Sequence, residues 1–119
     1  MKPVDAEDVA RDAAEAWLAH VDAGDAAASH RHAASTFRKA VTEEQWGESM
    51  GRVQESLGRP LERAFRSAEY HSELPGAPDG HYVVLTYATR FARKEHGMET
   101  VTPQLDTDGV WRVSGYFVK

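Results

Sequence analysis

One acidic residue, Glu99, is the strongest candidate for chemistry in this sequence. Two glycine-containing turns place it on the apolar face of a predicted sheet, opposite Arg93 in one neighbouring strand and Phe117 in the other. Burial beside Phe117 would raise the pKa of the carboxyl, whereas Arg93 would lower it. A carboxylate tuned in this way can act as a general acid or base. The alternative is a structural cross-strand ion pair near the end of the sheet, contributing about 0.5 kcal/mol.

Six histidines raise the question of a metal site. His30 and His32 are two positions apart, so on a helix they lie on nearly opposite sides, whereas helical metal ligands are spaced at i and i+4. His71 and His81 could approach each other across the connector of residues 74–80, but the sequence offers no third ligand. We therefore predict no metal site.

Other catalytic and binding motifs are missing from the sequence. There is no cysteine, which excludes thiolate chemistry, cysteine-ligated zinc and disulfides. No serine nucleophile elbow, phosphate-binding glycine loop or dinucleotide fingerprint occurs. The formal net charge is −5, with the acidic excess in the first 30 residues, whereas a phosphate backbone demands a basic face. We predict no cofactor and no nucleic-acid partner.

The first half of the chain has the periodicity of helices. A first helix is expected from Asp5, with Val9 and Trp17 on its apolar face, and an alanine-rich segment follows. Residues 42–45 (TEEQ) form a capping box, and they begin a further helix that ends at Gly58. The apolar stripe of this helix consists of Trp46, Met50, Val53 and Leu57.

The last third of the chain has the periodicity of strands, with turns that predict their register. Residues 94–98 (KEHGM) and 106–110 (DTDGV) each have the form of a type I turn followed by a glycine bulge. With these turns Tyr87 lies opposite Leu105, and Leu105 opposite Trp111. Pro103 predicts a bulge or local edge, because proline cannot donate to the ladder. The resulting inner face carries Tyr87, Phe91, Val101, Leu105, Trp111, Val113 and Phe117.

Helices at about residues 5–58 followed by strands at about 61–118 predict an α+β fold, with a helical layer packed on an antiparallel sheet. The length of 119 residues fits one domain, residues 1–119. No apolar run approaches the ~20 residues of a membrane span, and residues 1–17 lack the apolar centre of a secretory signal.

Six segments spread over almost the whole chain resemble one bacterial family. They are WLAHVDAGDAAAS (17–29), TFRKAVTEEQW (36–46), LG (57–58), LPGAPDGHYVV (74–84), ETVT (99–102) and DGVWRVSGYFV (108–118). Their order and spacing are similar to those of the family known as domain of unknown function 4019, of the nuclear transport factor two-like superfamily. The resemblance implies a cone, in which a curved antiparallel sheet of about four strands wraps around N-terminal helices. It implies a pocket at the open end, a dimer contact through the sheet and an exported, periplasmic location, and it implies no activity.

The aromatic residues and the outer face of the sheet define the expected sites. The candidates for lining a pocket, or else for filling a solid core, are Trp17, Trp46, Tyr87, Phe91, Trp111 and Phe117. The outer face carries mostly small, uncharged residues, which is unusual for a solvated surface and predicts a homodimer through the sheet. This expected dimer face consists of Tyr82, Val84, Thr86, Arg90, Thr102, Arg112, Ser114 and Tyr116.

The sequence favours a non-enzymatic module that binds a small apolar ligand or a protein partner in an aromatic-lined pocket. One alternative is a small isomerase, dehydratase or hydrolase-type enzyme that uses Glu99 with Arg93 or with a helix histidine in the pocket. Another is a structural dimerisation module. An open cavity at Glu99, with another titratable group within hydrogen-bond reach, would favour the enzyme.

Overall fold

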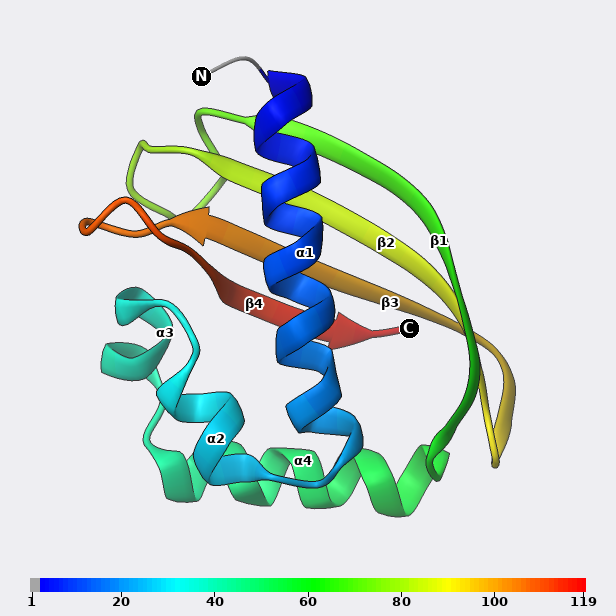
Figure 1. Ribbon diagram of the computed structural model, residues 1–119. Coiled ribbons are helices and arrows are strands. Elements are labelled where there is room, and N and C mark those ends of the chain that lie inside the picture. Colours follow the sequence, from blue (N-terminus) through cyan, green and yellow to red (C-terminus); the bar gives the residue numbers. More distant parts are fainter. Residues whose placement is uncertain (1–2) are drawn as a thin grey trace.

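The computed structural model describes residues 3–119, in which four helices precede four strands (Figure 1). The helices are α1 (Pro3–Asp22), α2 (Ala26–Arg31), α3 (Ser35–Ala40) and α4 (Glu43–Leu57). The strands are β1 (Pro60–His71), β2 (Tyr82–Phe91), β3 (Lys94–Leu105) and β4 (Trp111–Val118). They form one antiparallel sheet in the order β1-β2-β3-β4. The predicted α+β fold is confirmed.

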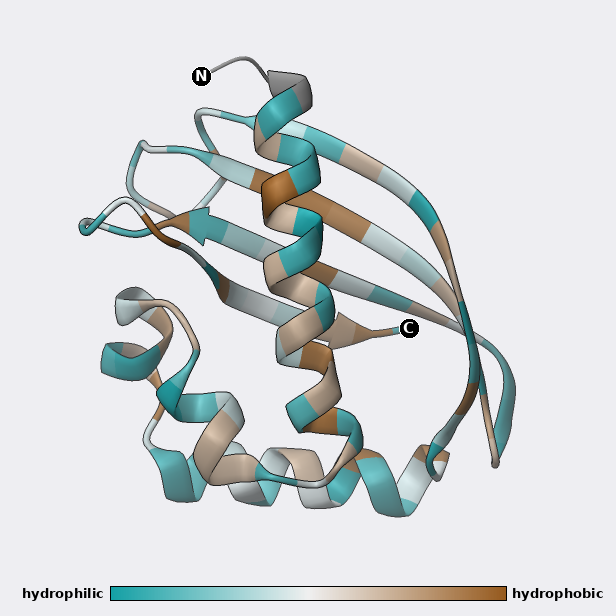
Figure 2. Ribbon diagram, in the orientation of Figure 1, coloured by the Kyte–Doolittle hydropathy of each residue, from teal (hydrophilic) through white to brown (hydrophobic). Residues whose placement is uncertain are grey.

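Helix α1 lies against one face of the sheet, and the strands curve around it toward α4 (Figure 1). The hydrophobic residues of β2 lie where α1 crosses the sheet (Figure 2). On the helix side of this contact, Ala6, Ala10 and Ala14 are buried, and such small side chains let a helix approach a sheet closely. The apolar face of α1 is therefore rotated from the predicted one, and Val9 is 48% exposed. Within residues 3–119, no helix is long and apolar enough to cross a membrane.

Helix α4 begins and ends where the sequence predicts. The Thr42 hydroxyl accepts a hydrogen bond from the Gln45 amide at 3.1 Å, and the Gln45 side chain accepts one from the Thr42 amide at 3.0 Å. This pair satisfies two of the amides that have no partner inside the helix. Gly58 follows the last turn with a φ of 75°, a conformation that glycine adopts without strain.

The turn between β3 and β4 sets only part of the predicted register. Leu105 pairs with Trp111 as predicted, and the expected bulge lies between Thr102 and Pro103. The bulge adds one residue to β4. The residues that follow it in this strand therefore point to the faces opposite to those predicted. Tyr116, predicted on the outer face, therefore packs inward against Trp17. Phe117, predicted on the inner face, instead points outward and is 56% exposed.

The predicted register between β2 and β3 is wrong. Phe91 pairs with Lys94 across a two-residue turn. A bulge or irregularity between Thr89 and Phe91 shifts the pairing by one residue, so Tyr87 lies opposite Glu99 and not opposite Leu105. The physical reason is the role of Gly97, which lies inside β3 and not in the turn. A Cβ atom at this position would lie 2.7 Å from the Phe91 ring, so the glycine allows the ring to pack against the backbone.

Candidate functional site

The carboxylate of Glu99 is fully buried and makes hydrogen bonds to three side chains. Arg63 of β1 donates to both oxygens, from Nε at 2.7 Å and from Nη2 at 3.1 Å. The Thr89 hydroxyl donates to Oε1 and the Tyr116 hydroxyl to Oε2, each at 2.5 Å. The sheet brings these residues together, because β2, β3 and β4 are neighbours and β1 lies beyond β2.

These contacts keep Glu99 ionised. Burial disfavours the charged carboxylate, but the hydrogen bonds from the three donors outweigh it and hold the pKa of Glu99 below its usual range. Burial and the neighbouring carboxylate raise the pKa of Tyr116. Neither group is therefore suited to exchange a proton near neutral pH, as general acid–base catalysis requires.

Arg63, and not Arg93, is the ionic partner of Glu99. The Arg63 guanidinium also binds Asp22 at the end of α1, at 2.8 and 3.0 Å, and so ties the helix to the sheet. In the observed β2–β3 register Glu99 lies opposite Tyr87, so Arg93 is not its cross-strand neighbour. Arg93 instead donates to the carbonyls of Glu55 and Gln54 at the end of α4, at 3.1 and 3.2 Å. Cations at this end of a helix are favoured by its dipole.

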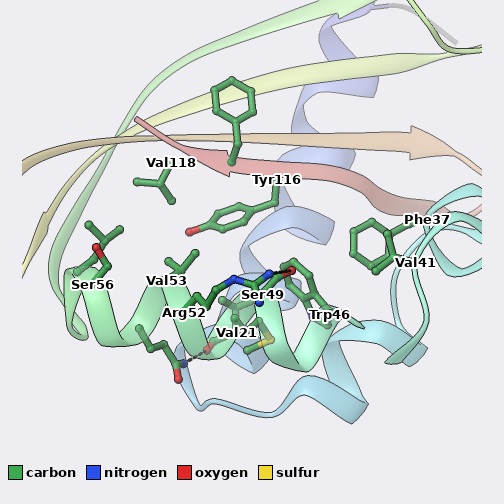
Figure 3. A pocket seen from close by; sticks show the side chains of 14 residues that line it. Val21, Phe37, Val41, Trp46, Ser49, Arg52, Val53, Ser56, Tyr116 and Val118 are labelled. Carbon is green, nitrogen blue, oxygen red and sulfur yellow. Dashed lines mark hydrogen bonds between the residues drawn. The ribbon is translucent and has the colours of Figure 1, made fainter. Parts of the chain in front are cut away.

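A groove with a volume of about 630 Å³ runs between β4 and α4 (Figure 3). The Tyr116 ring lies between the strand and the helix, with Val53 facing it from α4 (Figure 3). Phe37 and Val41 lie at one end of the groove. The lining is mainly apolar, and among the described residues that form it only Arg52 carries a formal charge. Such an apolar concavity with few polar groups is typical of binding sites.

The predicted pocket aromatics divide between this groove and the core. Trp46 lines the groove, and Phe117 also borders it despite its outward side chain. Trp17 lies behind Trp46, with ring centroids 5.7 Å apart, and both indole N–H groups donate to Ser29. The remaining three, Tyr87, Phe91 and Trp111, are buried outside the groove lining.

Several groove residues were not predicted to line a pocket. Val53 and Leu57 were recognised as part of an apolar helical stripe, but such a stripe by itself indicates only burial. Val53 is 37% exposed because nothing among the described residues covers it. Tyr116 was predicted on the outer face and not in the groove, because Pro103 indicated a bulge but not which strand carries the extra residue.

The structure places the residues of the expected dimer face in different surroundings. Arg90 binds Glu62, and Arg112 binds Asp106 and Asp108, so both arginines already have ionic partners. Tyr82 is buried, and its hydroxyl donates to the Pro78 carbonyl. Tyr116 belongs to the opposite face. The predicted outer-face residues without these contacts are Val84, Thr86, Thr102 and Ser114.

The histidines make protein contacts. His30 Nε2 donates to the Val41 carbonyl at 2.6 Å, and His81 bonds to the Tyr70 hydroxyl. The rings of His20 and His32 stack with centroids 5.2 Å apart, a contact that spacing did not indicate. In the part of the chain that the structure describes, no three His, Cys, Asp or Glu side chains are placed to hold a metal ion.

The turn between β3 and β4 also supports α3. Asp106 accepts hydrogen bonds from the Ser35 amide at 3.0 Å and from the Ser35 hydroxyl at 2.7 Å. Burial opposes the charge on Asp106, but these bonds and Arg112 hold the pKa of its carboxyl below the usual range. The residue therefore caps a helix that has no side-chain cap of its own, which places Phe37 at the end of the groove.

Comparisons with known proteins identify a family for this chain and no individual relative. Residues 13–116 match the family described as Protein of unknown function (DUF4019). Neither the search of curated proteins nor the search of solved structures found a match. Since the matched segment covers most of the sequence, the chain belongs to the DUF4019 family of proteins of unknown function.

Proposed function

We propose that this chain is a non-catalytic binding module and that the groove between α4 and β4 is its site. The observation that carries the proposal is the apolar groove itself, which leaves Val53 and neighbouring residues uncovered. Its volume of about 630 Å³ lies within the range of ligand sites. The occupant we propose is a small apolar ligand or an apolar segment of a protein partner.

The state of Glu99 argues against the enzyme alternative. Titratable groups do lie within hydrogen-bond reach of the carboxylate, but each of its two oxygens already accepts two hydrogen bonds and the side chain is fully buried. Tyr116 separates Glu99 from the groove, because its ring lines the groove while its hydroxyl binds the carboxylate. Glu99 therefore acts in our proposal as a positioning residue for Tyr116.

The arrangement of layers supports the nuclear transport factor two-like cone and a single domain. An antiparallel sheet curves around α1, and α4 lies near its β4 edge (Figure 1). The groove lies between α4 and β4. We propose that the chain forms one domain of this superfamily, since one core cluster includes residues from α1, α4, β2, β3 and β4.

Binding at the groove is tested with the apolar, anionic dye anilinonaphthalene sulfonate. We expect wild-type protein to bind the dye and Val53→Asp to reduce its affinity at least tenfold, because a carboxylate in an apolar groove costs about 1.4 kcal/mol or more. The matched control is Val9→Asp, which adds the same charge on an exposed position of α1. Equal dye affinity in the two variants, measured by fluorescence titration, would contradict the proposed site.

We also propose a homodimer through the outer face of the sheet. Phe117 and Met98 expose 56% and 39% of their surface there, and they extend the uncharged patch of Val84, Thr86 and Thr102. In sedimentation velocity, we expect wild-type protein at twice the chain mass and Met98→Lys largely at the chain mass. The control Val110→Lys changes an exposed valine in the β3–β4 turn and should stay dimeric. A monomeric wild-type protein would exclude this dimer.

A further inference from the structure

The second half of β4 has an unused hydrogen-bonding edge. Met98 and Lys119 exchange both backbone hydrogen bonds, at 3.1 and 2.9 Å. Bonded and non-bonded pairs alternate along an antiparallel ladder. Counting back along β4, Phe117 therefore bonds to β3, whereas the N–H and C=O groups of Tyr116 and Val118 point away from it. Within residues 3–119 no hydrogen bond to these four backbone groups is formed.

The other exposed edges of the sheet are protected. Strand β1 carries the exposed charged residues Glu62, Arg66 and Glu69, and charges on an edge strand discourage pairing with another chain. The first half of β4 lies beside α3, and the Ala34 amide, which precedes that helix, donates to the Val113 carbonyl at 2.7 Å. Among residues 3–119, the stretch from Tyr116 to Val118 has neither exposed charged side chains nor a hydrogen bond from a neighbouring segment at its edge.

This unpaired edge faces the groove. Tyr116, Phe117 and Val118 all line it, although neighbouring strand residues point to opposite faces of a sheet. Three consecutive residues can line one groove only along the edge of their strand. The groove therefore offers two kinds of contact, with apolar side chains on one side and backbone donors and acceptors on the other.

This combination decides between a lipid and a peptide. An acyl chain that filled the groove would remove water from the backbone groups of Tyr116 and Val118 and give them no partner. Each buried group left unpaired costs about tenfold or more in affinity. An extended peptide supplies the missing donors and acceptors and directs alternate side chains into the groove.

We propose that an extended segment of a partner protein binds here as a fifth strand beside β4. Its inward side chains are apolar and contact Val53 and Tyr116, and an acidic residue at one end faces Arg52, the one charged residue among the described groove lining. This inference rests on the proposed function of the groove and names its ligand class.

Hydrogen exchange reports the edge directly. In the free protein we expect the amides of Tyr116 and Val118 to exchange quickly and that of Phe117, paired with β3, to exchange slowly. A bound strand should slow exchange at Tyr116 and Val118 at least tenfold and change Phe117 little. The measurement is residue-resolved exchange by NMR, with and without peptide.

The probe is a peptide selected from a random linear library displayed on phage, with Val53→Asp protein as the counter-selection target. The selected peptide and two copies of it, each N-methylated at one of the two alternate sets of backbone amides, are then titrated into wild-type protein. We expect one of these two N-methylated peptides to bind at least tenfold more weakly than the parent, because its methyl groups replace the N–H donors that face β4. Val118→Pro, which removes one edge amide of the protein, should weaken the parent peptide similarly, and Val9→Asp should not.

Four results would overturn the inference. The first is equal affinity of the parent peptide and both N-methylated peptides, and the second is unprotected amides at Tyr116 and Val118 with peptide bound. The third is that no peptide is enriched over the counter-selection. The fourth is a wild-type dimer that Val118→Pro dissociates, which would make a second copy of the chain the occupant. Dodecanoate is titrated in parallel. If dodecanoate or the dye binds in a Val53-dependent manner and no peptide does, the proposed function stands and the inference fails.

Discussion

Replacing Glu99 with alanine is expected to lower the free energy of unfolding by about 3–5 kcal/mol, the usual cost of removing one member of a buried ion pair. Among the residues that the structure describes, the change leaves the partly buried Arg63 with Asp22 as its one ionic partner. It also removes the carboxylate that accepts the hydrogen bonds of the Thr89 and Tyr116 hydroxyls. Urea unfolding followed by circular dichroism measures the difference.

The control for this prediction is Glu62→Ala. Glu62 also pairs with an arginine, Arg90, but at 3.4 Å and with both side chains largely exposed, so its removal should cost less than about 1 kcal/mol. If both variants lose the same small amount, the buried network does not stabilise the fold as described.

The effect of Glu99→Ala should also depend on pH. The folded-state pKa of Glu99 lies below its ordinary value of 4.5, so the carboxylate stabilises the fold fully above that pH. As the pH falls below about 4.5, the folded state must accept a proton against this preference, and the contribution is lost. The stability difference between wild type and Glu99→Ala should therefore shrink between pH 5 and the acid limit of folding.

Glu99 connects stability with the proposed binding site. Its hydrogen bond holds the Tyr116 hydroxyl, and the Tyr116 ring lines the groove. Glu99→Ala protein that is still folded should therefore bind the dye more weakly than wild type. A catalytic role for Glu99 makes no such prediction for dye binding.

The second large effect is expected at Gly58, where the chain passes from α4 into β1. Gly58 has φ 75° and ψ −174°, a region open essentially to glycine alone. A Cβ atom there would lie 2.8 Å from the Cβ of Ala92 in the β2–β3 turn. Gly58→Ala should therefore cost about 2–4 kcal/mol from backbone strain and overlap, measured by urea unfolding.

Gly51→Ala is the matched control and should have the opposite sign. Gly51 lies within α4, and a Cβ atom there meets nothing within 4 Å. Alanine is the better helix former, so this substitution should stabilise the protein by about 0.5–1 kcal/mol. A neutral Gly58→Ala variant would show that the helix-to-sheet connection is less constrained than the structure indicates.

Features that depend on residues close together in the chain could be predicted from the sequence alone. The Thr42 capping box, the stop at Gly58 and the turn at residues 106–110 each depend on contacts between residues close in the chain. The same is true of the pairing of Leu105 with Trp111 and of the bulge at Pro103. These features predicted the α+β class and placed Glu99 correctly on a buried face.

The ionic partner of Glu99 and the position of the groove were determined by the tertiary structure alone. The side-chain period of a strand is two, so the single extra residue of the β4 bulge exchanged the faces of Tyr116 and Phe117. The pattern around Pro103 does not show which of the two strands carries that residue. Arg63 lies 36 positions from Glu99 and meets it only when β1 closes onto the sheet. Val53 was recognisable as apolar, but whether another element covers an apolar residue depends on how the whole chain packs. The groove exists because none of the described residues covers it.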